Sequence, residues 1–540
     1  MPTLSVTLNL GERNMAGCIS HQELKALMES GESYALFDVR EKGEYDARQI
    51  FTATSLPRRE IEFRLPRLVP VPKIPVIVYD EGGERATLAA ATMERMGYEK
   101  ISLLEGGIPA WSGAGYSTVS GVNVPSKAFG ERVHVERKVP EITPEELHAL
   151  QEKQEESLIL DVRTPQEYCR FCVPGAVNVP GGDLILWAEA LRQKPARTVV
   201  VNCAGRTRSI IGTATLRRLG LTNVYALKNG TMGWTLAGLE LETGPTRNAQ
   251  RPSAESSEQA GLAAERITTE ESIPLISVSQ LLTLRKEADR HILYQIDVRS
   301  EGEYAAGHIP GSMNIPGGQA VQRADDYIAV RNGQIVFISH RQSRAVMTAY
   351  WYRQMGFRNV AVLGGGIMGW VENGRASAVG APEEEPQALR AARNDVRLIQ
   401  PAELDRQLKS GRPIILDVGS SFRYEAAHVP GARWLSRGWL EPKIRTTFPN
   451  REQSIVLTCP NGRNSVLAAS TLGGLGYTEV SVLDGGVQAW SAGGYPTQKG
   501  LEGSIVEPND VVIAASLSED KEAMKRYLQW EVELSKTLKK

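Results

Sequence analysis

Two cysteines of this 540-residue chain begin loops whose residue types could activate a thiol. Cys203 opens the sequence Cys-Ala-Gly-Arg-Thr-Arg-Ser, and Cys459 opens the sequence Cys-Pro-Asn-Gly-Arg-Asn-Ser. Each cysteine ends an apolar, strand-like segment (VVVNC and IVLTC), and a helix-like segment follows each loop. A helix N-terminus offers unpaired backbone N–H groups and the positive end of a dipole, which favour the thiolate form of a cysteine.

The loop after Cys203 has the residue types that an anionic substrate needs. Its candidate substrate-binding residues are Ala204, Gly205, Arg206, Thr207, Arg208 and Ser209. Gly205 allows backbone angles that turn N–H groups inward. The two arginines supply positive charge for an anion and support a thiolate. We therefore predict that Cys203 is the reactive nucleophile.

The segment around Cys203 is one of four copies of a longer pattern. Four landmarks recur: an apolar strand ending in Asp, a second apolar strand running into a loop, a helix-ending Gly, and a Gly-rich turn that leads to Trp. The second landmark lies 42 positions after the first in every copy, and the third and fourth lie 17 and 31 positions after the second. The landmark residues are Asp38, Asp161, Asp297 and Asp417, then Asp80, Cys203, Ser339 and Cys459, then Gly97, Gly220, Gly356 and Gly476, then Trp111, Trp234, Trp370 and Trp490. Chance does not preserve three spacings in four copies, so the chain contains four duplicated domains.

The four loops differ in the residue that takes the position of Cys203. Asp80 and Ser339 cannot carry sulfur, so copies one and three are expected to be structural or to dock partners. Cys459 keeps the thiol, but Asn464 replaces the second arginine and Gly419 replaces an arginine of the first landmark. The sequence does not decide whether Cys459 is active, so the protein could have one or two working sites.

Each copy is expected to be a small α/β domain with a doubly wound parallel sheet. The strands are short runs of Val, Ile and Leu, as in sheets covered by helices on both faces. Capping boxes predict a helix start at Ser20, Thr143 and Ser277, and Gln400 begins a weaker version. In such sheets ligands bind beyond the carboxyl ends of strands, where the cysteine loops lie.

The predicted organisation is four tandem domains and a C-terminal helical tail. The domains are expected at 15–118, 138–243, 268–376 and 395–498, and the tail at 505–540, with a helix at 518–538 that packs on the body. Residues 243–268 and 380–394 are polar and are expected to be exposed connections.

These motifs resemble the rhodanese family of sulfurtransferases, over about residues 18–498. The resemblance rests on the DVR-x-x-x-EY segments (Asp161–Tyr168 and Asp297–Tyr304), the HIPG motif (His308–Gly311), the loop cysteine, and the GG-x-x-x-W turn. It implies that Cys203 takes the outer sulfur of thiosulfate as a persulfide and passes it to cyanide, to a thiol or to a partner protein. It implies covalent, ping-pong catalysis without a metal or organic cofactor.

Three other functions were compared with this one. Mercaptopyruvate is the second choice of donor, because the loops of mercaptopyruvate-type relatives are more neutral. A non-enzymatic scaffold, or a relay that hands persulfide sulfur to a partner, remains open because two copies are degenerate. Related phosphatases have a loop one residue longer, and the shorter spacing of Cys203 and Arg208 favours sulfur over phosphate.

Other candidate residues have structural explanations beside the functional ones. Cys169 and Cys172 form a C-x-x-C pair that could be a redox dithiol, half a zinc site or a partner of Cys203. Simple substitution is favoured, because Cys172 takes the position of His308 and His428. Asp161 and Arg163 are expected to be structural, with Arg163 pairing with Glu167, and Cys18 is expected to have no catalytic role.

The composition excludes several classes of protein. The net charge is −1, from 62 basic and 63 acidic residues, so no field attracts nucleic acid or an anionic membrane. No apolar run approaches the roughly 20 residues that span a bilayer, and no signal peptide is recognisable. A cytoplasmic protein that acts on small molecules is expected.

Overall fold

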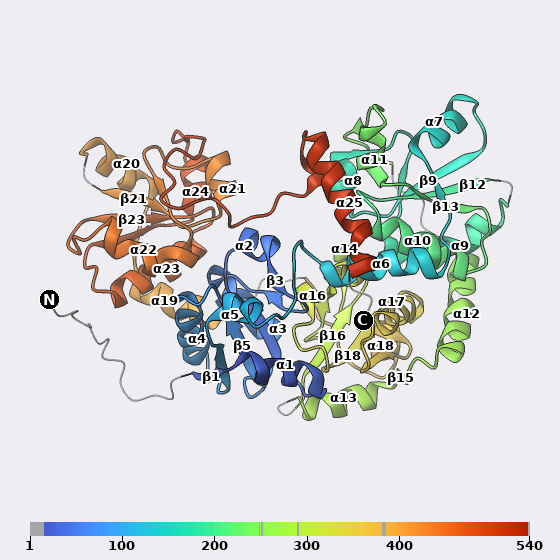
Figure 1. Cartoon of the computed structure of the whole chain (residues 1–540), viewed down its shortest axis with the longest axis horizontal. Coiled ribbons are helices and arrows are strands. Elements are labelled where there is room, and N and C mark those ends of the chain that lie inside the picture. Colours follow the sequence, from blue (N-terminus) through green and yellow to red (C-terminus); the bar gives the residue numbers. More distant parts are fainter. Residues whose placement is uncertain are drawn as a thin grey trace.

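Four parallel, five-stranded sheets organise the chain, each inside its own α/β unit (Figure 1). The computed structural model describes residues 16–537 except 196, 248, 250–251, 289–290, 381–384 and 412. The strand order is the same in all units: β1-β6-β5-β2-β4, β8-β13-β12-β9-β11, β15-β19-β18-β16-β17 and β20-β24-β23-β21-β22. The predicted fold class is therefore confirmed, with an additional short strand at each edge of every sheet beyond the three strands that the sequence pattern indicated.

The strands are short and mostly buried. In the first two units they are β1 (Gly17–Ile19), β2 (Ala35–Asp38), β4 (Thr54–Ser55), β5 (Val76–Tyr79), β6 (Ile101–Leu104), β8 (Glu141–Ile142), β9 (Ser157–Asp161), β11 (Val177–Asn178), β12 (Thr198–Asn202) and β13 (Val224–Leu227). In the last two they are β15 (Leu275–Ile276), β16 (Leu293–Asp297), β17 (Met313–Asn314), β18 (Gln334–Ile338), β19 (Val360–Leu363), β20 (Arg397–Ile399), β21 (Ile414–Asp417), β22 (Arg433–Trp434), β23 (Ile455–Thr458) and β24 (Val480–Leu483). Two antiparallel pairs lie outside these sheets: β3 (Gln49–Ile50) with β7 (Thr118–Val119), and β10 (Phe171–Cys172) with β14 (Glu242–Thr243).

Helices cover the sheets and connect the units. The first half of the chain contains α1 (His21–Ser30), α2 (Lys42–Ala47), α3 (Ile61–Leu68), α4 (Arg85–Arg95), α5 (Gly107–Gly113), α6 (Val124–Glu136), α7 (Pro144–Glu152), α8 (Pro165–Arg170), α9 (Leu184–Arg192), α10 (Thr207–Arg218), α11 (Gly230–Leu236) and α12 (Ala254–Glu270). The second half contains α13 (Val278–Lys286), α14 (Glu301–Ala306), α15 (Gly317–Gln322), α16 (Ala324–Tyr327), α17 (Ser343–Gln354), α18 (Gly366–Glu372), α19 (Gln387–Asp395), α20 (Pro401–Lys409), α21 (Ser421–Ala426), α22 (Leu440–Thr447), α23 (Arg463–Gly474), α24 (Gly486–Ala492) and α25 (Lys521–Thr537). Short 3₁₀ turns are η1 (Arg58–Glu60), η2 (Gly181–Asp183), η3 (Arg437–Trp439) and η4 (Ala515–Leu517).

The helix starts follow the predicted capping residues. Ser20, Thr143 and Ser277 each accept a hydrogen bond from the backbone three residues on and complete a capping box. Gln400 precedes α20 without a side-chain cap, as its weaker motif indicated. Local sequence therefore determines where the first helix of each unit begins.

Each predicted linker contains a packed helix, so the expectation of fully exposed connections was wrong. Residues 248, 250–251 and 381–384 of these segments lie outside the described residues. Most of 243–268 belongs to α12, which lies against α9 and α17 and buries Ala260, Ala264 and Ile267. Part of 380–394 belongs to α19, which packs on α23 through Leu389 and Ala392. Alanine lines both contacts, and its small side chain gave little hydrophobic signal in segments that are otherwise polar.

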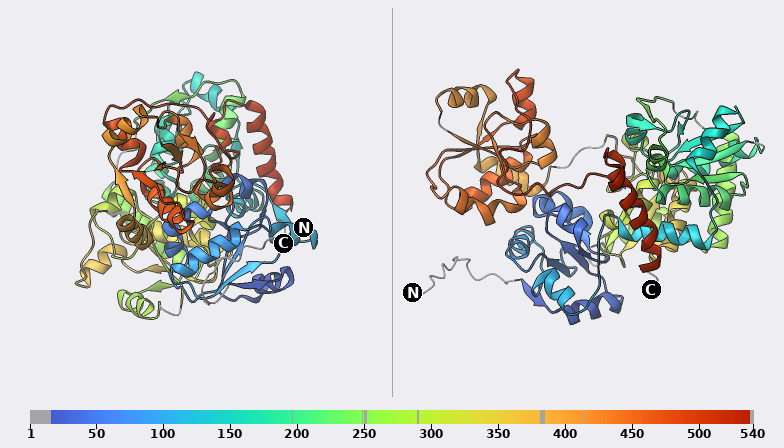
Figure 2. Two further views of the ribbon diagram at one scale, coloured as in Figure 1. Left: turned by 90° about the vertical axis from the view of Figure 1, so that its left-hand side faces the viewer. Right: turned by 45° about the horizontal axis from the view of Figure 1, so that its top comes forward.

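The predicted C-terminal helix, α25, lies beside α6, the helix that connects the first two units (Figure 1). Residues after the fourth unit run past the first unit, where Gly43 donates a backbone hydrogen bond to Asn509 and Arg59 donates to the Asp510 carbonyl. Figure 2 shows α25 reaching the second unit from the fourth one. The tail therefore spans three units and is part of the body of the protein.

Two substitutions in α12 test whether this helix packs as observed. Ala264 is fully buried, so Ala264→Asp places an unpaired charge in the α12 contact and should lower the free energy of unfolding by about 3 kcal/mol or more. Gly261 has open space around its Cα, so Gly261→Ala should raise stability by about 0.5–1 kcal/mol. Urea unfolding of both variants checks the contact. An Ala264→Asp protein as stable as wild type would mean that α12 does not pack there.

Candidate active site

Cys203 lies where strand β12 ends and the loop to helix α10 begins. Strand β12 is central in its sheet, between β9 and β13, and the thiol is 2% exposed. Its Sγ is 3.5 Å from the Ser209 hydroxyl, and that hydroxyl donates to the Arg206 carbonyl. The loop therefore folds around the thiol at the carboxyl edge of a parallel sheet, where such folds place ligands.

A glycine from the Gly-rich turn holds this loop in place. Gly230 has φ +57°, and a Cβ there would lie 2.2 Å from the Cys203 carbonyl oxygen. The next residue, Thr231, donates its N–H to that same oxygen at 2.9 Å. The other units repeat this contact, with Gly107 against Asp80, Gly366 against Ser339 and Gly486 against Cys459. The constant spacing of 31 residues to Trp therefore reflects a fixed approach of two backbone segments.

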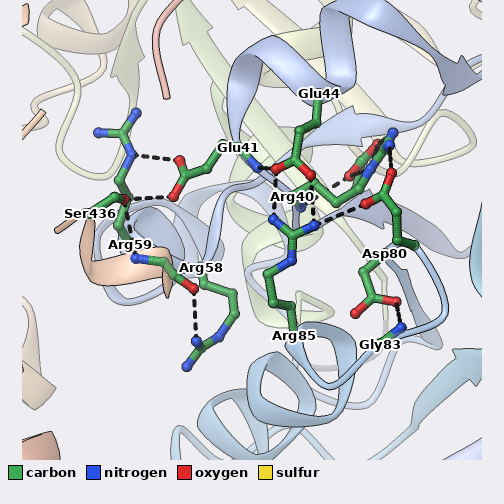
Figure 3. Close-up of polar contacts among 12 residues, drawn as sticks. Arg40, Glu41, Glu44, Arg58, Arg59, Asp80, Gly83, Arg85 and Ser436 are labelled. Carbon is green, nitrogen blue, oxygen red and sulfur yellow. Dashed lines mark hydrogen bonds and ion pairs between the residues drawn. The ribbon is translucent and has the colours of Figure 1, made fainter. Parts of the chain in front are cut away.

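In the first unit, the backbone N–H groups of the loop bind a carboxylate. The Asp80 carboxylate accepts hydrogen bonds from the backbone N–H groups of Gly82, Gly83 and Ala86, at 2.7, 3.0 and 2.9 Å. Figure 3 shows the bond from Gly83. Asp80 therefore supplies a negative charge to the N-terminal end of its own helix. In unit two the sulfur of Cys203 takes the equivalent position.

Both arginines of the Cys203 loop are already paired with carboxylates. Arg206 forms two hydrogen bonds with Glu131 of α6, at 2.6 and 3.0 Å, and a third with Glu141. Arg208 binds both carboxylate oxygens of Glu167, at 2.7 and 2.8 Å. Burial of Glu167 favours a raised pKa, but the charge and hydrogen bonds of Arg208 outweigh burial and lower the pKa to about 2. These guanidinium groups hold the loop in place, and the carboxylates of Glu131 and Glu167 compensate their positive charge.

The pairing predicted for Arg163 was wrong. Its guanidinium binds the Asp161 carboxylate, at 2.7–3.1 Å, and donates to the Phe171 carbonyl. Glu167 is used by Arg208 instead. The same two pairs occur in the first and third units, where Arg40 binds Asp38 and Arg299 binds Asp297, and where Glu44 binds Arg85 and Glu303 binds Arg344. Asp and Arg two residues apart at a strand end face the same buried side, which sequence spacing alone did not reveal.

Gly205 lies in a closely packed part of the loop. Its φ is not in the left-handed region, contrary to the expected use of unusual backbone angles. A Cβ on Gly205 would lie 2.9 Å from Met232 Cε and 3.4 Å from Glu531 Oε2. The loop is therefore packed closely beneath the tail helix.

A cleft of about 570 Å³ opens over the Cys203 loop, and several units supply its walls. Its lining includes the loop 203–208, residues 120–123, Lys127 of α6, Gln322 of the third unit, and Tyr527, Trp530 and Glu531 of α25. Thr207 donates its hydroxyl hydrogen to Glu531 at 2.6 Å, which ties α25 to the loop. Sequence reasoning missed Lys127, Glu131 and the tail residues. The apolar face of the tail indicated packing, but nothing indicated this location.

The fourth unit has lost both ion pairs that surround the loop. Gly419 stands where the other units have the strand-end arginine, so buried Asp417 accepts only the Gly419 N–H in the part of the chain that the structure describes. Burial raises the pKa of Asp417 to about 7. Asn464 replaces the loop arginine and accepts from Arg437. Burial also raises the pKa of the Cys459 thiol, and the nearby Asp417 charge adds to this.

Cys172 occupies the position that histidine has in later units. It pairs with Glu242 across β10 and β14, as His308 pairs with Ala378 and His428 with Gln498. Burial raises the pKa of Cys172 to about 11, whereas Cys169 is exposed on α8. This supports simple substitution for Cys172. Within the described residues, no cluster of three or more His, Cys, Asp or Glu side chains could hold a metal, and no helix is long and apolar enough to span a bilayer.

Comparisons with known proteins agree with this architecture. The model of the rhodanese-like domain matches residues 20–114, 143–237, 277–373 and 400–493. A crystal structure of a thiosulfate sulfurtransferase from Pseudomonas aeruginosa superposes with a TM-score of 0.90 at 35% identity, covering 97% of this chain and 98% of that one. Thiosulfate sulfurtransferase GlpE of Ectopseudomonas mendocina (strain ymp) is 30% identical over 87 residues, 16% of this chain and 78% of the relative. GlpE of Pseudomonas putida (strain GB-1) is 28% identical over 105 residues, 19% of this chain and 93% of the relative.

The glycine contact predicts the behaviour of the Cys203 thiol. Gly230→Ala should displace the Cys203 carbonyl and remove the thiol from the loop N–H groups, so alkylation of Cys203 by iodoacetamide at pH 7 should slow by about tenfold. Gly238→Ala is the matched control, because Gly238 also has a positive φ but no atom lies within 4 Å of the added Cβ. Peptide mapping of the alkylated protein measures the rate. Equal rates in both variants would show that the turn does not position the thiol.

Asp417 predicts a pH dependence of stability. Its folded-state pKa of about 7 exceeds the ordinary value of 3.8, so its favourable contribution is complete below about pH 4 and is lost as the pH rises through 7. Asp417→Asn should therefore raise the melting temperature at pH 8 and raise it by a smaller amount at pH 5. Asp297→Asn, which leaves Arg299 without its partner, should lower it at both pH values. An Asp417→Asn protein that is less stable than wild type at pH 8 would contradict this account.

Proposed function

We propose that this chain, which belongs to the rhodanese family, is a thiosulfate sulfurtransferase that carries sulfane sulfur on Cys203. The observation that carries the proposal is the position of the Cys203 thiol, at the end of a central strand, inside a loop that a cleft exposes to small molecules. The 35% identity to a thiosulfate sulfurtransferase over nearly the whole chain supports the choice of thiosulfate.

The first half-reaction is a displacement at sulfur. The Cys203 thiolate attacks the outer sulfur of thiosulfate, a bond forms between Sγ and that sulfur, and the sulfur–sulfur bond of thiosulfate breaks. Sulfite leaves with the electron pair of that bond, and Cys203 becomes a persulfide anion. In the second half-reaction cyanide or a thiolate attacks the outer persulfide sulfur, and Cys203 leaves as a thiolate. No external oxidant is needed, and the kinetics are ping-pong.

The loop backbone is suited to stabilising the persulfide. In the first unit three loop N–H groups bind the Asp80 carboxylate, and the equivalent positions in the second unit are Gly205, Arg206 and Ser209. Backbone donors aimed at a developing negative charge act as an oxyanion hole does, without reorganising during the reaction. The persulfide anion would occupy the place of that carboxylate.

The other three loops support a single sulfur-carrying site. Asp80 and Ser339 have no sulfur, and their loop arginines contact neighbouring units: Arg85 stacks on Trp439, and Arg344 pairs with Asp183. Cys459 is fully buried, and its raised pKa keeps it as a thiol at neutral pH. We assign units one, three and four structural roles in this reaction.

Mass spectrometry of the intact protein tests the proposal. After incubation with thiosulfate and removal of the excess, wild type should gain the mass of one sulfur atom. Cys203→Ser should gain none, and Cys459→Ser, the matched thiol control, should gain the same as wild type. Subsequent addition of cyanide should remove the added mass and release thiocyanate.

Three outcomes would change the assignment. No gain in wild type would reject thiosulfate as the donor, and a gain from mercaptopyruvate instead would select the alternative substrate. A gain in Cys203→Ser that disappears in Cys459→Ser would move the site to the fourth unit. A persulfide that forms but does not react with cyanide or small thiols would favour a relay to a partner protein.

A further inference from the structure

We propose that Lys127 of α6 binds the anionic sulfur donor in the Cys203 cleft. This inference rests on the proposed function and adds the residue that selects a donor by its charge. Lys127 lies outside the domain that contains Cys203, in the helix between the first two units.

The inference begins with the cations that line the cleft. They are Lys127, Arg206, Arg208 and Arg526. The charge of Arg206 is compensated by Glu131 and Glu141, and that of Arg208 by Glu167. Arg526 is exposed and lies 3.5 Å from Asp520. Among the described residues that line the cleft, Lys127 is the one cation with no carboxylate oxygen within 4 Å.

The surroundings of Lys127 keep its ammonium group in place without neutralising it. The side chain is only 5% exposed, and Nζ lies 4.9 and 4.8 Å from the ring centres of Tyr527 and Trp530. Aromatic faces attract a cation through their quadrupole, but they carry no net charge. A largely buried ammonium without a counter-ion is unfavourable, so an anion that enters the cleft gains a strong electrostatic interaction.

Carboxylates farther from Lys127 stabilise its ammonium form without pairing with it directly. Burial lowers the pKa of Lys127, and the carboxylates of Glu531, Asp46 and Asp325 oppose the shift. Glu531 is committed to the loop, because one of its oxygens accepts from Thr207, and the other is buried near Gly205 with no hydrogen-bond donor. Thiosulfate and the departing sulfite are both dianions, so a single positive charge at the cleft wall would favour them over less charged donors.

The site is then assembled from two helices outside the catalytic domain. Helix α6 supplies the cation, and α25 supplies the two rings that hold it and the glutamate that contacts the loop. Gly121 has no room for a side chain, because a Cβ there would lie 2.1 Å from the Trp530 ring. The close contact of α25 with residues 120–123 therefore determines where the ammonium group lies.

A pair of donors that differ by one charge tests this inference in the full-length protein. Thiosulfate is a dianion, and methanethiosulfonate is a monoanion with the same outer sulfur and a sulfinate leaving group. Lys127→Met should raise KM for thiosulfate at least about tenfold with a smaller change in kcat, and should lower the thiosulfate-to-methanethiosulfonate ratio of kcat/KM about tenfold. Lys127→Arg, which keeps the charge, should restore much of that ratio.

Controls separate this inference from folding and from the proposed function. Arg526→Met removes a cation from the rim of the same cleft and should change the ratio by less than about twofold. Persulfide formation from methanethiosulfonate in Lys127→Met shows that the variant is folded. If wild type takes sulfur from thiosulfate and Lys127→Met has the wild-type ratio, the role of Lys127 is rejected. If wild type takes no sulfur from thiosulfate, the proposed function fails first.

Discussion

The four units share one constraint. In each of them the loop between the central strand and the following helix presents backbone N–H groups that need a negative partner. The first unit supplies the Asp80 carboxylate from its own chain. The second has Cys203 there, where the proposed function places a thiolate and then a persulfide. The third has Ser339, whose buried hydroxyl has no hydrogen-bond partner in the structure as described. One loop geometry thus holds a carboxylate in one unit and a cysteine sulfur in another.

Ion pairs around the loop explain how the units differ. Three units keep a strand-end Asp–Arg pair and a Glu–Arg pair between the second helix and the loop helix. The fourth unit has lost both, and its Asp417 and Cys459 are buried beside each other with raised pKa values. Burial favours the neutral forms of both groups, which suits a packed core. The loop cysteine of the fourth unit therefore lies in surroundings unlike those of Cys203.

The degenerate units still shape the site. The first unit faces the fourth unit, where Glu41 accepts a hydrogen bond from Ser436 (Figure 3). Arg85 stacks on Trp439 of the same unit. The loop arginine of the third unit binds Asp183 of the second. These contacts join the degenerate units to their neighbours. The Cys203 cleft itself is lined by α6, α25, Asp46 and Ala47 of the first unit and Gln322 of the third.

The sequence by itself determined the repeat, the parallel α/β fold, the helix starts, the family and the loop around Cys203. These features follow from spacing, strand-like apolar runs and capping residues, which act over a few residues or recur in four copies. Only the tertiary structure decided that helices α12 and α19 pack on their neighbours and that Arg163 pairs with Asp161. It also decided that carboxylates compensate the charges of Arg206 and Arg208. It also placed Lys127 and Glu531 at the cleft. Glu531 and Thr207 are 324 residues apart in sequence. Such contacts depend on how whole units dock, and docking is governed by complementary shape and charge that no local pattern records.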